Sequence, residues 1–209
     1  MSSAPTDASK RAQLNKTLLR WHWISAALSL FGMLLFSVTG ITLNHAAQIG
    51  AEVQRHTEEL TLPDSMLSEL RRAAAADQPE LPVIARRWLE QRLDMSLGSD
   101  QAEWSADELY LSMPHPGGDA WISIDLGNGA LLAERSDRGW LAYFNDLHKG
   151  RHTGAAWRWF IDLFALACLV FCLTGLWLLA LQANRRVSTW PLVALGLLLP
   201  ALIALLLIH

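Results

Sequence analysis

The chain has 209 residues, of which 52% are hydrophobic, and its 17 Lys and Arg against 20 Asp and Glu give a formal net charge of −3. A chain this apolar with this little net charge is neither intrinsically disordered nor a typical nucleic-acid-binding protein. Three long apolar stretches, at 18–43, 160–181 and 190–208, contain only two charged residues, Arg20 and Asp162, so a soluble domain is also excluded.

Each apolar stretch approaches or exceeds the roughly 20 residues that a helix needs to cross a hydrocarbon core of about 30 Å. The sequence therefore predicts three transmembrane helices, at residues 17–44, 153–182 and 189–209. A signal peptide is the alternative for the first stretch, but signal peptides have an apolar core of only about 7–15 residues. The length of the stretch favours an uncleaved anchor.

The basic residues beside the spans predict the orientation, because Lys and Arg near the ends of spans are retained in the cytoplasm. Residues 1–16 form a basic tail and residues 183–188 a basic turn, and both are predicted to be cytoplasmic. Residues 45–152, with 18 acidic and 10 basic side chains, are then predicted to lie outside the cytoplasm. The chain is expected to be a multi-pass protein whose first partner is the lipid bilayer.

Residues 45–152 show the periodicity of a small α+β module. Apolar side chains recur at helical spacing over residues 64–93, where prolines divide the pattern into two short predicted helices. The period changes to two at residues 108–113 and 121–126, which predicts strands. An Asn-Gly pair within residues 128–134 predicts a hairpin turn and a returning strand.

The hairpin from Ala120 to Leu132 resembles the closing hairpin of a PepSY domain, in which a strand ends near an acidic residue and turns through a glycine. The segments on either side of the module carry a related resemblance. They are Arg20-Trp21-His22-Trp23 and Leu35-Phe36-Ser37-Val38-Thr39-Gly40-Ile41 in the first span, and Asp146-Leu147-His148-Lys149-Gly150-Arg151-His152 and Leu173-Thr174-Gly175-Leu176-Trp177-Leu178 around the second. Over nearly its whole length the chain resembles the PepSY-associated transmembrane helix family.

This resemblance implies a membrane protein with a three-helix transmembrane bundle and an extracytoplasmic α+β PepSY-like module between helices 1 and 2. Larger members resemble siderophore-iron reductases of the bacterial inner membrane, which carry b-type haems between their helices. The resemblance thus implies an inner-membrane location, a periplasmic module and haem b as the cofactor. Those larger members have at least four spans and this chain has three, which puts a complete electron path within one chain in doubt.

Five of the seven histidines lie at or near a predicted membrane boundary, where ionisable groups are costly and often functional. Haem ligation by two histidines requires imidazoles from two helices on opposite sides of the porphyrin. His45 meets this requirement together with His148 or His152, because all three lie at the outer boundary of antiparallel spans. The sequence does not rank His148 against His152. The alternative is that these histidines are interfacial side chains that bind no ligand.

His22 lies at the inner end of the first span, about 35 Å of helix away from His45. An inner haem requires either His22 from a second copy across a two-fold axis or a different ligand; otherwise His22 is an interfacial residue. His209 is a further candidate for the outer site. Arg151 and Arg158 are candidates to pair with the haem propionates, because a guanidinium group matches a carboxylate bidentately.

Two functions are predicted on this basis. The first is a haem-dependent membrane redox protein that transfers electrons across or along the membrane to a periplasmic acceptor such as a ferric siderophore, which makes it a candidate component of a ferric reductase. Its expected partners are a second copy of the chain or another membrane redox protein, and an iron chelate. The alternative is a non-enzymatic, membrane-anchored PepSY module that binds a periplasmic protein or peptide. Neither function involves nucleic acid.

Overall fold

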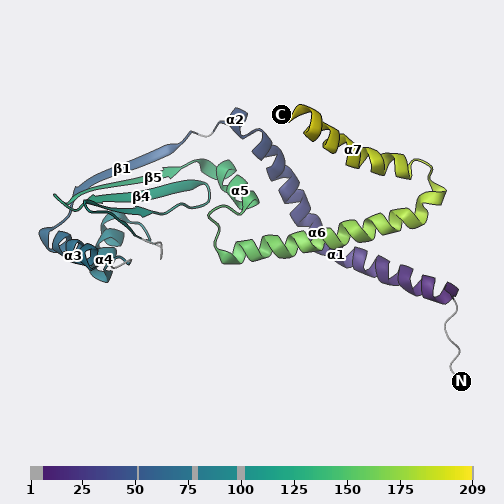
Figure 1. The fold of residues 1–209 in the computed structure, drawn as a ribbon, viewed down its shortest axis with the longest axis horizontal. Coiled ribbons are helices and arrows are strands. Elements are labelled where there is room, and N and C mark those ends of the chain that lie inside the picture. Colours follow the sequence, from purple (N-terminus) through teal and green to yellow (C-terminus); the bar gives the residue numbers. More distant parts are fainter. Residues whose placement is uncertain (1–6, 51, 77–79, 98–101, 209) are drawn as a thin grey trace, which may run out of the picture. The chain divides into compact units, whose positions relative to one another are not determined.

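The computed structural model describes residues 7–50, 52–76, 80–97 and 102–208, which belong to two compact units (Figure 1). The helical unit comprises residues 1–35 and 159–209, and the module unit comprises residues 36–158. The described helices are α1 (Asp7–Asn44), α2 (Ala46–Ile49), α3 (Asp64–Ala75), α4 (Val83–Leu93), α5 (Gly139–Lys149), α6 (Ala155–Gln182) and α7 (Thr189–Leu207). The described strands are β1 (Gln54–Thr61), β2 (Glu103–Trp104), β3 (Glu108–Ser112), β4 (Gly118–Asp125) and β5 (Ala130–Asp137).

Among the described residues, three helices are long and apolar enough to cross a membrane, namely α1, α6 extended to Arg185, and α7. The three predicted apolar helices are therefore present, and the protein is a multi-pass membrane protein. Helix α1 begins at Asp7, well before the predicted start of the span at residue 17. Within the helical unit α1 and α6 approach closely at Gly32, because the ring of Phe164 occupies the space that a Cβ would need.

The module unit contains a five-stranded sheet in the order β1-β5-β4-β3-β2, in which every neighbouring pair is antiparallel (Figure 1). Strands β3, β4 and β5 occupy the positions that the alternating pattern predicts. Strands β1 and β2 lie outside the predicted strands. Strand β1 is mostly exposed and polar, so it has no apolar alternation that would mark it, and it forms by pairing along the whole length of β5.

The core of the module lies between the sheet and the helices α3 and α4, which cover one face of the sheet (Figure 1). Alternate residues of β4 point inward, and Ile122 and Ile124 are fully buried. Leu70 on α3 and Leu89 on α4 are also fully buried. In each helix the buried residues are spaced three or four apart, so they form one apolar face towards the sheet. Burial of these apolar side chains away from water stabilises the module.

Candidate functional site

The first candidate residue, His22, lies on α1 in the helical unit and contacts α6. Its Nδ1 lies 3.0 Å from Oγ1 of Thr174. Its ring stacks on that of Phe171, with 4.7 Å between the ring centroids and an interplanar angle of 14°. The ring also lies beside Gly175, where an added Cβ would come within 3.2 Å of Cε1. A stretch of five residues on α6 thus holds the imidazole.

The ring of His22 forms part of the wall of an open groove in the helical unit, with a volume of about 500 Å³. The other residues that line it come from α6 and are mostly apolar: Phe171, Cys172, Gly175, Leu176, Leu178, Leu179 and Gln182. An apolar wall with a single imidazole suits a large, flat, apolar ligand that is anchored at one point.

The second candidate residue, His148, lies in the last turn of α5 in the module unit and contacts the end of α1. Its Nδ1 lies 2.6 Å from Oγ1 of Thr39. The ring of Phe36 lies against it, with 4.8 Å between centroids and an interplanar angle of 43°. A Cβ on Gly40 would lie 3.7 Å from Cε1 of His148, which is an ordinary contact. Beside this contact, Oγ1 of Thr42 donates a hydrogen bond to Oδ1 of Asn145 on α5 at 2.9 Å.

A buried carboxylate attaches α5, and with it His148, to the sheet of the module. Asp146 is 4% exposed, and its Oδ2 accepts hydrogen bonds from the backbone N–H of Gly117 at 2.9 Å and from the guanidinium group of Arg138 at 3.0 Å. Gly117 has φ = 78°, a conformation that favours glycine. Because the carboxylate is hydrogen-bonded and paired, it has a structural role and positions the helix that carries His148.

The two histidines are held by the same short motif, Phe-x-x-Thr-Gly, which occurs at 36–40 on α1 and at 171–175 on α6. In each copy the Phe ring packs on the imidazole, the Thr hydroxyl hydrogen-bonds to Nδ1, and the Gly lies beside Cε1. The first motif, and Thr174 and Gly175 of the second, lie in segments that carry the family resemblance, but the sequence did not predict these contacts. The signal that could have found them is the identical spacing in two different spans.

The other predicted ligands are arranged differently. His45 follows the end of α1, is exposed, and forms a hydrogen bond between Nδ1 and the carbonyl oxygen of Ile41 at 3.0 Å. Helix α5 ends at Lys149, and His152 lies in the following loop with φ = 57°. His148 and His152 therefore do not share one helix face. Within the described part of the chain, neither of them hydrogen-bonds to His45 or stacks on it, so their pairing remains a prediction.

The predicted propionate partners, Arg151 and Arg158, are exposed, and neither forms an ion pair among the described residues. In the same part of the chain, no group of three or more His, Cys, Asp or Glu side chains is placed to hold a metal ion. His209, the remaining boundary histidine, lies outside the described residues.

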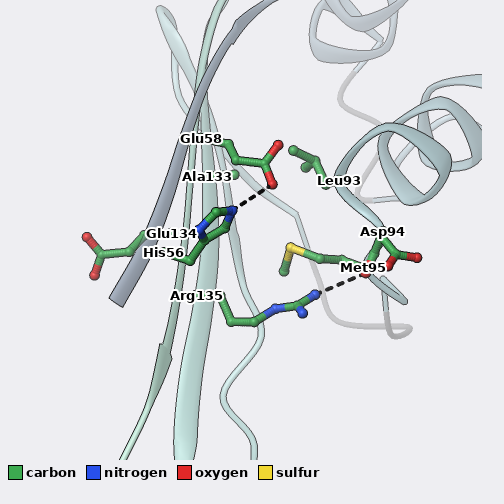
Figure 2. Close-up of a pocket in the computed structure, with 8 residues that line it drawn as sticks. All are labelled: His56, Glu58, Leu93, Asp94, Met95, Ala133, Glu134 and Arg135. Atoms are coloured by element: carbon green, nitrogen blue, oxygen red, sulfur yellow. Dashed lines mark hydrogen bonds and ion pairs between the residues drawn. The ribbon is translucent and has the colours of Figure 1, made fainter. Parts of the chain in front are cut away.

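A smaller concavity of about 180 Å³ lies in the module between strands β1 and β5 and the end of α4 (Figure 2). His56 and Glu58 form an exposed pair within it, with 3.2 Å between Nε2 and Oε1. Arg135 donates a hydrogen bond to the carbonyl oxygen of Asp94 at 3.1 Å (Figure 2). His56 and Glu58 pair along β1 and Arg135 reaches across to Asp94, so these polar groups satisfy one another and have the character of a solvated surface rather than of a reaction centre.

Both copies of the motif and both histidines lie inside the region that a family model describes. The model, PepSY_TM-like, matches residues 13–209. The chain belongs to the PepSY_TM-like family. The predicted family is therefore confirmed, and the three apolar helices and the α+β module of this PepSY_TM-like protein fit it. No curated protein and no solved structure matches the chain significantly.

Proposed function

We propose that this PepSY_TM-like protein binds haem b in the membrane, with His22 and His148 as the histidines that hold the haem iron, and transfers electrons to an acceptor outside the cytoplasm. One observation carries the proposal. Both imidazoles are held through Nδ1, and within the described residues neither Nε2 forms a hydrogen bond. A histidine that binds a metal through one ring nitrogen is commonly oriented by a hydrogen bond at the other.

The surroundings of both rings fit a haem. Haem iron has four porphyrin nitrogens as ligands, so it needs only one or two further imidazoles and no larger cluster of protein ligands. Each ring lies beside a glycine and against a phenylalanine, which gives both imidazoles an apolar contact surface. The groove beside His22, of about 500 Å³, is lined mainly by apolar side chains.

Bound haem supplies reversible one-electron oxidation and reduction of its iron. The residues of the chain hold the imidazoles and keep water from them with apolar side chains. Arg151 and Arg158, which follow His148 in the chain, are proposed to pair with the propionates, because both guanidinium groups are exposed and form no ion pair among the described residues.

A second histidine that would hold the iron is proposed for each site. For His148 the candidates are His45 and His152, which the basic residues beside the spans predict to lie on the same side of the membrane. For His22 the candidate is the same residue of a second copy, because the predicted cytoplasmic boundary offers no other histidine. The proposal therefore includes a homo-oligomer or a partner membrane redox protein.

The proposed orientation follows from the basic residues at 1–16 and 183–188, which favour the cytoplasmic side. The α+β module then lies in the periplasm of a bacterium, where it contacts the electron acceptor. A ferric siderophore is the proposed acceptor, and the support for it is the likeness of larger family members to siderophore-iron reductases. Reduction of such a chelate adds one electron to the ferric iron and makes the protein a ferric reductase component.

The test is a dithionite-reduced minus oxidised spectrum of the purified protein in detergent, with haem per chain quantified. We expect a Soret shift with b-type α and β bands, and we expect His22→Ala and His148→Ala each to lower the haem content. His56→Ala is the matched control, because His56 is exposed on the module and lies in neither motif. A colourless protein from haem-replete cells would overturn the proposal.

One observation favours the alternative, a membrane-anchored binding module without redox chemistry. Strand β1 is the edge of the described sheet, and its residues are mostly exposed. An exposed edge can pair with an extended segment of another protein, and backbone hydrogen bonds then supply the affinity. A colourless protein that nevertheless retains a periplasmic peptide or protein would support this function.

A further inference from the structure

The hydroxyl group that holds His22 already uses its own proton. Oγ1 of Thr174 lies 2.7 Å from the carbonyl oxygen of Val170 and 3.1 Å from that of Phe171, and it donates to these backbone acceptors. A hydroxyl group has one proton to donate and two lone pairs. Towards His22 it is therefore an acceptor, and Nδ1 of the ring carries the proton in the 3.0 Å hydrogen bond.

The same accounting applies to the other copy of the motif. Oγ1 of Thr39 donates to the carbonyl oxygen of Phe36 at 3.2 Å. Nδ1 of His148 lies 2.6 Å from that hydroxyl oxygen, so His148 is the donor in this hydrogen bond. In both motifs, therefore, the threonine hydroxyl oxygen accepts a hydrogen bond from Nδ1–H of the histidine.

We propose that Thr174 and Thr39 are positioning residues that hold His22 and His148 in the Nδ1–H tautomer, so that both rings offer the Nε2 lone pair to a haem iron. In a neutral imidazole one nitrogen carries the proton and the other the lone pair. A metal binds the unprotonated nitrogen. The role towards haem rests on the proposed function, whereas the tautomer is a property of the chain alone.

The glycines of the two motifs make the inference more specific, because they restrict the two rings to different degrees. A Cβ at residue 175 would lie 3.2 Å from Cε1 and 3.7 Å from Nδ1 of His22, which is tight enough to displace the ring. A Cβ at residue 40 would lie 3.7 Å from Cε1 of His148, which an unshifted ring tolerates. Gly175→Ala is therefore expected to disturb its histidine and Gly40→Ala is not.

The tautomer is tested first, on the full-length protein in detergent without haem. Nitrogen-15 chemical shifts of labelled histidines distinguish Nδ1–H from Nε2–H. We expect Nδ1–H for both His22 and His148, and we expect Thr174→Val to abolish the preference at His22 while leaving that of His148 unchanged. An Nε2–H ring at His22 in the unmodified protein would overturn the inference, whether or not the protein binds haem.

The effect on the metal site is tested by haem titration, redox midpoint and electron paramagnetic resonance of the ferric protein. Thr174→Val is expected to weaken haem binding at the His22 site by roughly 10–100-fold and to shift its midpoint, as is usual when the partner of a ligating histidine is removed. Thr174→Ser retains the hydroxyl and is expected to restore both values. At the His148 site, Thr39→Val should likewise weaken haem binding and shift the midpoint, and Thr39→Ser should restore both values.

Two further variants separate this inference from general damage and from the proposed function. Ser29→Ala removes another buried hydroxyl of α1, one that bonds only to the carbonyl oxygen of Ser25 among the described residues, and should leave the midpoint unchanged. If His22→Ala lowers the haem content but Thr174→Val behaves like Thr174→Ser, the inference fails and the proposed function stands. If His22→Ala and His148→Ala retain all haem, the proposed function fails, and the nitrogen-15 shifts still decide the tautomer.

Discussion

The fully buried side chains of the module and the most buried side chains of the membrane helix α1 differ in polarity. In the module the fully buried side chains are apolar, as at Leu89 and Ile122. In α1 the buried side chains include Ser25 and Ser29, which are 3% and 0% exposed, whereas the neighbouring Leu28 is 71% exposed. The two regions face different solvents. Water drives apolar groups inward, whereas lipid accepts them and leaves small and polar groups for contacts between helices.

The largest expected effect comes from the same substitution made in both regions. Leu89→Ala in the core of the module should lower the free energy of unfolding by about 2–5 kcal/mol, because it removes buried methyl groups and leaves a cavity. Leu173→Ala in α6 is the matched control, since that side chain is 58% exposed, and it should change stability by less than about 0.5 kcal/mol. Urea unfolding in detergent measures both. Equal losses of stability in the two variants would contradict the expected difference between the module and the membrane helices.

The next effect concerns the buried carboxylate that attaches α5 to the sheet. Asp146→Asn should cost about 2 kcal/mol, because it removes the charge that accepts the Gly117 N–H and pairs with Arg138. The same chemical change at Glu69, which pairs with Arg72 on the exposed side of α3, should cost no more than about 0.5 kcal/mol. Thermal unfolding of the two variants compares a buried pair with a surface pair. A larger loss at Glu69 would contradict the prediction.

A smaller effect is expected where a membrane helix buries a polar group. Ser29 is fully buried, and its hydroxyl donates to the carbonyl oxygen of Ser25 at 2.7 Å. Ser29→Val should cost about 1 kcal/mol, because the added methyl overpacks a closely packed position and the lost hydrogen bond is local. Leu30→Val, at a side chain that is 65% exposed, is the control and should have almost no effect. Detergent-denaturation midpoints would measure both variants.

The smallest effect concerns a tyrosine on the sheet. Burial, followed by the nearby carboxylates of Asp119, Glu103 and Glu108, raises the pKa of Tyr110 above its ordinary value of 10.0. The unfolded chain therefore loses the phenolic proton at lower pH than the folded chain, and stability falls as the pH rises above about 10. Between about pH 9 and about pH 11, Tyr110→Phe should lose slightly less stability than the unmodified protein in urea unfolding. An unchanged loss would show that Tyr110 does not contribute.

The sequence predicted those helices and strands whose spacing of apolar residues shows directly which side chains face water, lipid or a core. The three apolar helices, α3, α4 and strands β3 to β5 all appear where the sequence predicts them. Strand β1 does not follow this rule, because its polar residues have no apolar period and its conformation depends on pairing with β5. Strand β2, only two residues long, is too short to show a period.

The candidate site was only partly predictable, because its contacts join residues that are far apart in the sequence. His22 and His148 were identified from their positions at or near the predicted membrane boundaries, and the spacing of His148 and His152 left a shared helix face open. Helix α5 ends at Lys149, Gly150 follows it with φ = 65°, and His152 lies in a loop beyond it. A glycine just after a basic last turn is a local stop signal for a helix, and this signal could have predicted the break.

By itself, the sequence determined whether each segment lies in water or in lipid, the number of apolar helices and the family. These follow from the hydrophobicity and the periodicity of neighbouring residues. Only the tertiary structure decided which side chains hold the two histidines. Thr174 is 152 residues from His22, and His148 is 109 residues from Thr39. Contacts across such separations depend on how whole helices meet, and hydrogen bonds at those meeting points select the ring nitrogen that remains available.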